Sequence, residues 1–81
     1  MNVRVRLFAA ARQAAGQETV EVVLPDGATV AALREQLAAR VPPLSAMLPR
    51  MLIAINAQYA TESTAVPANS DVACIPPVSG G

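Results

Sequence analysis

Apolar and polar residues alternate in two segments near the start of the chain, which is the pattern of strands that bury one face. In VRVRLF, residues 3–8, Val and Leu fall on one face, while Arg and Phe fall on the other. In TVEVVL, residues 19–24, the residues Val20, Val22 and Leu24 share a face. We expect these segments to pair as antiparallel strands, with a Pro-Asp-Gly turn after the second.

Helical patterns follow each of these strands. Residues 9–16, AAARQAAG, are rich in Ala, and Gly16 is a typical helix stop, which predicts a short helical turn. Residues 30–41, VAALREQLAARV, predict the main helix, with Thr29 as its N-cap and the diproline 42–43 as its end. The expected apolar stripe of this helix consists of Val30, Leu33, Leu37 and Val41.

The second half of the chain predicts three more strands. Residues 44–50 are expected to form an irregular or short helical connector, and the apolar run MLIAIN, residues 51–56, predicts a well-covered strand. A turn then leads to a short return strand at residues 58–61. DVACIP, residues 71–76, is expected to be the last strand. It should stop at Pro76, because proline has no N–H to donate to a ladder. Its two faces consist of Val72 with Cys74 and of Ala73 with Ile75.

This order of elements predicts an α+β fold in which one main helix covers one face of a mixed sheet. The first and last strands are rich in β-formers, so we place them side by side at the centre of the sheet. The result is the β-grasp, or ubiquitin-like, arrangement. We expect residues 1–81 to be a single domain, with residues 76–81 as a flexible functional C-terminal tail.

Composition excludes several classes of function. The net charge is zero, with six Arg against six Asp and Glu, and only two residues are aromatic, so neither nucleic acid nor an acidic membrane is an expected partner. A single cysteine, Cys74, excludes an internal disulfide framework and any four-cysteine cluster. No signal peptide or membrane span is predicted, which favours a cytoplasmic location. The chain has neither His nor Lys, so a partner would have to supply acid–base groups to any reaction.

The sequence ends in PPVSGG, residues 76–81. A diproline keeps the segment extended, and six residues reach at most about 20 Å. Gly80 and Gly81 lack side chains, so they fit a narrow channel. The α-carboxylate after Gly81 would be ionised, since its ordinary pKa is about 3.3–3.7. Such a group becomes an electrophile after adenylation by ATP; the alternative is a frayed tail without function.

Three stretches resemble the MoaD-type sulfur carriers, the small subunits of molybdopterin synthase. They are LFAAARQAAG (residues 7–16), LIAIN (residues 52–56) and DVACIPPVSGG (residues 71–81). The chain departs from the family pattern in having Gln13 where Glu is usual, Cys74-Ile75 in place of a Phe pair, and a different turn at residues 69–71.

The resemblance implies that Gly81 is adenylated, converted to a thiocarboxylate and used to donate sulfur to a pterin precursor, which forms the molybdopterin dithiolene. The implied partners are the large subunit of the synthase, in a heterotetramer, and a ubiquitin-like activating enzyme that uses ATP. No cofactor or metal is expected on this chain, and no activity is expected from it alone. Gly80 would give access to the terminus, and Pro76, Pro77, Val78 and Ser79 would set its reach.

Several residues near the tail are candidate partner contacts, each with a plainer alternative. Phe8, Ile75 and Val78 form either an exposed apolar patch or ordinary packing. Arg12 is either a partner contact or a solvated helix residue. Cys74 is expected to be a small buried hydrophobe, and a sulfur-carrying thiol is the alternative.

Three other functions stay open at this point. One is a sulfur carrier for another pathway, such as thiamine synthesis. Another is a ubiquitin-like protein modifier that forms isopeptides, and the third is a β-grasp binding module with an inert tail. The Pro-Pro-Val-Ser approach to the terminus favours the molybdopterin family.

Overall fold

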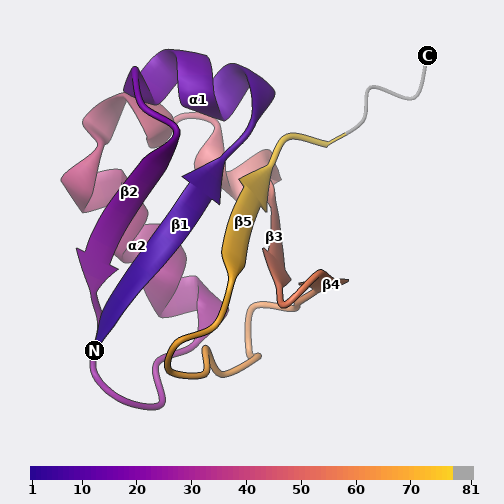
Figure 1. Ribbon diagram of the computed structural model, residues 1–81. Coiled ribbons are helices and arrows are strands. Elements are labelled where there is room, and N and C mark those ends of the chain that lie inside the picture. Colours follow the sequence, from indigo (N-terminus) through magenta and orange to yellow (C-terminus); the bar gives the residue numbers. More distant parts are fainter. Residues whose placement is uncertain (78–81) are drawn as a thin grey trace.

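A five-stranded mixed sheet runs through residues 1–77, the part of the chain that the computed structural model describes (Figure 1). The sheet order is β2-β1-β5-β3-β4. Its strands are β1 (Asn2–Leu7), β2 (Thr19–Val23), β3 (Leu52–Ile55), β4 (Gln58–Tyr59) and β5 (Val72–Ile75). The predicted β-grasp arrangement is therefore confirmed, with β1 and β5 adjacent and β5 in the middle.

The strand pairing places the first and last strands of the chain side by side. β1 pairs with β2 in the antiparallel sense, with Val5 opposite Val20, as the alternation predicted. β1 pairs with β5 in the parallel sense, with Leu7 opposite Cys74. Because parallel neighbours need a crossover, the intervening chain carries the main helix across the sheet. The C-terminal end of β5 consequently lies beside the end of β1, where α1 begins.

Two α-helices and two 3₁₀ turns connect the strands. They are α1 (Ala9–Ala15), α2 (Val30–Arg40), η1 (Pro42–Leu44) and η2 (Leu48–Arg50). Gly16 ends α1 in the left-handed conformation, with a φ of 73°, as is usual for a glycine at this position. Its N–H donates to the carbonyl of Arg12 at 2.9 Å. The Thr29 hydroxyl accepts from the Ala32 N–H at 3.4 Å at the start of α2, so the predicted N-cap is confirmed.

α2 lies behind the sheet in Figure 1 and covers one of its faces. The predicted stripe of α2 is buried there, together with the inward residues of β1 and β2. Arg34, at the edge of this layer, donates from Nε to Glu62 at 2.8 Å and from one terminal nitrogen to the carbonyl of Leu48. The side chain thus ties α2 to η2 and to the loop before β5.

Element ends differ slightly from the predicted ones. β1 stops at Leu7, and Phe8 instead takes the N-cap position of α1 with φ −122° and ψ 150°. The connector predicted at residues 44–50 contains the end of η1, a turn at residues 45–47 and η2; a proline lies in the first turn of each 3₁₀ segment, where it is favoured. The hairpin turn at Asn56 and Ala57 has positive φ at both positions, as a type I′ turn requires. Asn56 also accepts from the Asp71 N–H through Oδ1 at 3.0 Å, so this hairpin is bound to the entrance of β5.

Candidate functional site

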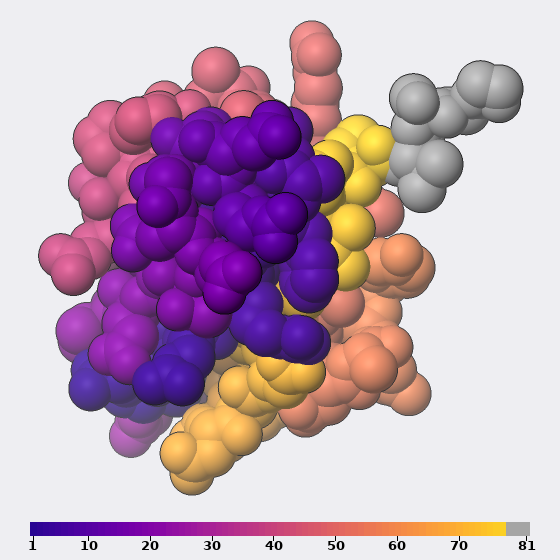
Figure 2. Space-filling view, turned by 45° about the horizontal axis from the view of Figure 1, so that its top comes forward, coloured from indigo at the N-terminus to yellow at the C-terminus, as the bar shows by residue number. Residues whose placement is uncertain are grey.

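The face of the sheet opposite α2 carries two unlike halves. On β1 and β2 it presents charged side chains, among them Arg4 and Glu21, whose closest N and O atoms are 3.4 Å apart. On β5, β3 and β4 it presents apolar side chains. Figure 2 shows the yellow residues at the end of β5 reaching the surface between the indigo and purple N-terminal segments and the orange β4 region. The apolar half therefore extends along β5 up to the point at which the chain leaves the sheet.

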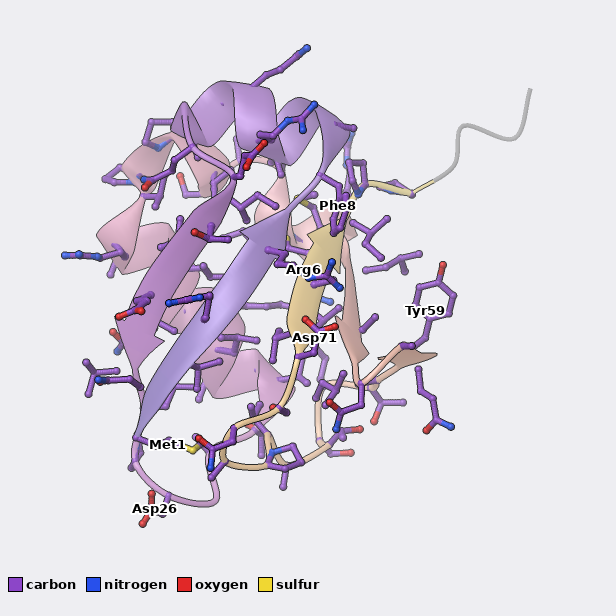
Figure 3. The ribbon with its side chains drawn as sticks, in the orientation of Figure 1. Met1, Arg6, Phe8, Asp26, Tyr59 and Asp71 are labelled. Carbon is purple, nitrogen blue, oxygen red and sulfur yellow. The ribbon has the colours of Figure 1, made fainter. Side chains whose placement is uncertain are left out.

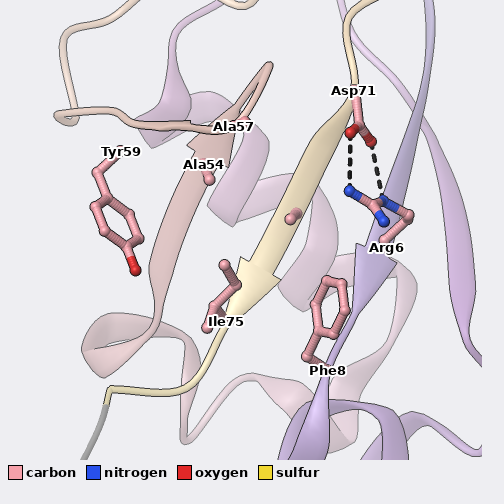
Figure 4. Close-up of a pocket in the computed structure, with 8 residues that line it drawn as sticks. Arg6, Phe8, Ala54, Ala57, Tyr59, Asp71 and Ile75 are labelled. Atoms are coloured by element: carbon pink, nitrogen blue, oxygen red, sulfur yellow. Dashed lines mark hydrogen bonds and ion pairs between the residues drawn. The ribbon is translucent and has the colours of Figure 1, made fainter.

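A shallow hollow of about 230 Å³ lies on this apolar half (Figure 4). Its floor is formed by Ala54 and Ala73, which are paired across β3 and β5 and are both buried. Larger side chains form its rim, so the two adjacent methyl groups account for the depression. We call its lining residues the tail-base surface: Arg6, Phe8, Ala54, Ala57, Tyr59, Asp71, Ala73 and Ile75.

An ion pair fixes one side of the tail-base surface. Arg6 donates from Nε to Asp71 Oδ1 at 2.9 Å and from its terminal NH2 nitrogen to Asp71 Oδ2 at 2.8 Å. This is the two-pronged geometry of strong arginine–carboxylate pairs. The Arg6 guanidinium carbon also lies 5.4 Å from the centre of the Phe8 ring, within the range of a cation–π contact. Figure 3 shows Phe8, Arg6 and Asp71 in line along β1 and β5.

The structure brings several predicted site residues together. Phe8 is 38% exposed and Ile75 is half-buried, and both line the tail-base surface. Pro76 and Pro77 follow β5 directly, and Pro77 is exposed. Arg12 is exposed on α1, where its guanidinium lies 3.8 Å from Glu18, and it lines a second hollow that it shares with Phe8. Val78, Ser79, Gly80 and Gly81 lie outside the described residues.

Four residues of this region were missed by the sequence interpretation. The sequence pattern marks Arg6 and Asp71 only as strand and loop positions, and Tyr59, which is 70% exposed, only as part of a return strand. Leu52 is 38% exposed opposite Ile75, although its segment was predicted to be well covered. Strict alternation within residues 52–55 would have placed Leu52 and Ala54 on one face, which was the available signal.

Cys74 is fully buried on the other face of β5, and its Sγ lies 3.5 Å from Met51 Sδ. Burial raises the pKa of the Cys74 thiol from 9.0 to about 11, against a smaller opposing effect of the Arg34 charge, because desolvation disfavours the thiolate. A thiol that is buried and protonated at neutral pH is a poor nucleophile. The prediction that Cys74 is a packing residue is therefore confirmed.

The raised pKa of Cys74 predicts a pH-dependent stability. Above pH 9 the unfolded chain loses the thiol proton while the folded chain keeps it, so the free energy of unfolding should fall as the pH rises from 9 to about 11. We expect a loss of about 2 kcal/mol from this group. Urea unfolding across that range measures it, with Cys74→Ala as the control. An equal slope in the control would contradict the assignment.

Within residues 1–77 no group of three or more His, Cys, Asp or Glu side chains could hold a metal ion. Among the same residues, no helix has both the length and the apolar character that crossing a membrane requires. The described part of the site thus has no cluster of metal-ligating side chains. What it offers is an apolar contact area at the base of the tail.

Comparison with known protein families shows which family this chain belongs to. The ThiS family matches residues 5–81, which includes the β-grasp core and the whole tail. The chain belongs to the ThiS family. The matched range includes Gly81, the residue predicted to carry the reacting carboxylate.

Two relatives of this ThiS family chain carry the name molybdopterin synthase sulfur carrier subunit. One, from Arabidopsis thaliana, is 32% identical over 81 residues, which cover all of this chain and 84% of the relative. The other, from Chlamydomonas reinhardtii, is 34% identical over 83 residues, with both chains fully covered.

Among solved structures, the chain is similar to SAMP1, the small archaeal modifier protein 1 of Haloferax volcanii. The TM-score is 0.89 at 28% identity, and both chains are covered completely. This similarity agrees with the ubiquitin-like β-grasp fold found here. Proteins similar to this chain are thus named both as a modifier protein and as sulfur carrier subunits.

Proposed function

We propose that this protein is the sulfur carrier subunit of a molybdopterin synthase. The observation that carries the proposal is the match of the ThiS family through Gly81, together with full-length relatives of that name. The apolar surface at the base of the tail supports it, because an enzyme that receives Gly81 must cover that region. The chain would act as a subunit of a sulfurtransferase complex.

The proposed chemistry takes place at the α-carboxylate of Gly81. A carboxylate oxygen attacks the α-phosphorus of ATP, which forms an acyl-adenylate and releases pyrophosphate. Hydrosulfide, or a donor that delivers sulfur at the same oxidation level, then attacks the acyl carbon and AMP leaves, so that a C–S bond replaces one C–O bond of the terminus. The thiocarboxylate donates this sulfur to the pterin precursor, and water restores the carboxylate. ATP is used by the activating enzyme and is not a cofactor bound to this chain.

The composition supports a division of labour between subunits. The chain has no His and no Lys, so it lacks the usual groups for moving protons and for holding a phosphate. The large subunit would supply these groups and bind the pterin precursor. The heterotetramer of two small and two large subunits is the assembly we propose.

The similarity to SAMP1 supports one alternative, a protein modifier joined to other proteins through Gly81. Both functions begin with adenylation of the same carboxylate, and they differ in the nucleophile that follows. An amine would give an isopeptide, whereas sulfur gives the thiocarboxylate. The names of the full-length relatives favour sulfur transfer over tagging, thiamine synthesis and an inert binding module.

A reconstitution tests the proposal. The chain is prepared as its Gly81 thiocarboxylate and incubated with the pterin precursor, with and without a molybdopterin synthase large subunit. We expect negligible dithiolene formation without the large subunit and turnover with it, because proton transfer and anion binding need the partner. The unmodified carboxylate form is the control. Efficient turnover by the small chain alone would refute the division of labour.

A further inference from the structure

Arg6 joins three elements of the tail-base surface. Arg6 comes from β1, and its carboxylate partner Asp71 precedes β5. The ring whose centre lies 5.4 Å from its guanidinium carbon belongs to Phe8 at the start of α1. Arg6 and Phe8 lie on the same side of the chain because they are two positions apart in an extended segment. The guanidinium therefore lies beside both the carboxylate and the ring (Figure 4).

Phe8 lies at a bend of the backbone, and its ring reaches the surface. The side chain is 38% exposed, and it is the N-cap of α1, where β1 has already ended. The next residue, Ala9, has a positive φ of 50°, so the backbone changes direction directly after Phe8. An exposed ring at such a bend can take several rotamers unless a neighbour selects one.

We propose that Arg6 is a positioning residue: held by Asp71, it fixes the Phe8 ring in one orientation so that the tail-base surface is ordered before a partner docks. The identity of that partner, the large subunit, rests on the proposed function. A partner that meets an ordered ring avoids the entropy cost of immobilising it. Arg6 thereby raises the affinity for the partner through Phe8 and not through its own contact.

Two observations favour this role over the plainer ones. The side chains of Arg6 and Asp71 are 49% and 54% exposed. The pair therefore lies at the surface and not in the buried core of the domain. Two of the three guanidinium nitrogens are already used by Asp71, so the group is bound to the chain itself. Lys could keep the charge but not the two hydrogen bonds that the planar guanidinium donates to one carboxylate.

The first arm of the test uses the free chain and needs no partner. NMR couplings of Phe8 report the populations of its χ1 rotamers. We expect one dominant rotamer in the parent chain and averaged values in both Arg6→Gln and Arg6→Lys. Arg4→Gln is the matched control, because Arg4 lies on the same strand and face but pairs with Glu21 away from Phe8. Averaged rotamers in the parent, or one rotamer retained in Arg6→Gln, would overturn the proposal.

The second arm measures binding to a molybdopterin synthase large subunit by titration. We expect Arg6→Gln to weaken binding roughly 2- to 12-fold, the range for ordering one side chain, and Arg4→Gln to leave it unchanged. In a Phe8→Ala background the effect of Arg6→Gln should disappear, because Arg6 then has no ring to position. An effect that persists there would show direct contact with the partner and would overturn the proposal.

The two arms separate this inference from the proposed function. If the parent chain does not bind the large subunit, the proposed function fails, while the rotamer populations of Phe8 still decide the role of Arg6. If the parent binds but Arg6→Gln binds equally well, the positioning role fails and the proposed function stands. Thermal unfolding of each variant provides the check that the fold is intact.

Discussion

Deletion of Gly81 is expected to abolish sulfur transfer and to leave the unfolding temperature unchanged. The reacting carboxylate would then follow Gly80, one residue short of the position that the activating enzyme and the large subunit must reach. Within residues 1–77 the buried core is built from residues no later than Cys74, so folding should not depend on the terminus. Dithiolene formation and thermal unfolding of the variant and the parent measure the two parts of this expectation.

Two further variants sharpen the test of the terminus. One added Ala after Gly81 should be as inactive as the deletion, since it moves the carboxylate in the other direction. Gln36→Ala, on the exposed side of α2, is the control and should transfer sulfur normally. Normal product formation from the shortened chain would remove Gly81 from the mechanism.

Ile75→Asp is expected to weaken binding to both the large subunit and the activating enzyme by at least about 30-fold, the cost of losing a well-packed interface anchor. Ile75 lines the tail-base surface and is only half-buried, so the variant places its charge in the contact and not in the core. The domain should therefore stay folded. Circular dichroism and titration with each partner measure the result.

Val23→Asp provides the matched control for Ile75→Asp. Val23 lies on the same open face of the sheet but on β2, and it is 70% exposed. The control variant should bind both partners like the parent. Because both partners must cover the base of one tail, each should also compete with the other for the chain. A folded Ile75→Asp variant with unchanged affinities would place the interface elsewhere.

The alternation of apolar residues was sufficient to predict most of the fold. A period of two placed Val3, Val5 and Leu7 on the buried face of β1, and a period near 3.6 placed Leu33 and Leu37 on the buried stripe of α2. These patterns are local, because each is set by where neighbouring side chains point. The end of β1 was harder to predict, since the residue after Leu7 continues the alternation although the backbone has already turned into α1.

The tail-base surface could be predicted only in part. Phe8 and Ile75 were expected near the tail because they lie at the ends of the two strands predicted at the centre of the sheet. The pairing of Arg6 with Asp71 joins residues 65 positions apart, and the hollow depends on the register that sets Ala54 beside Ala73. Such contacts follow from the register between distant strands, which no local pattern specifies.

The most direct test of the account is the intact mass of the chain after reaction with its activating enzyme, ATP and a sulfur donor. We expect a mass increase equal to the replacement of one oxygen by one sulfur, located on Gly81 by fragmentation and absent when ATP is omitted. Sulfur found on Cys74 instead, or a terminus that stays a carboxylate while sulfur transfer proceeds, would contradict the proposal that Gly81 carries the sulfur.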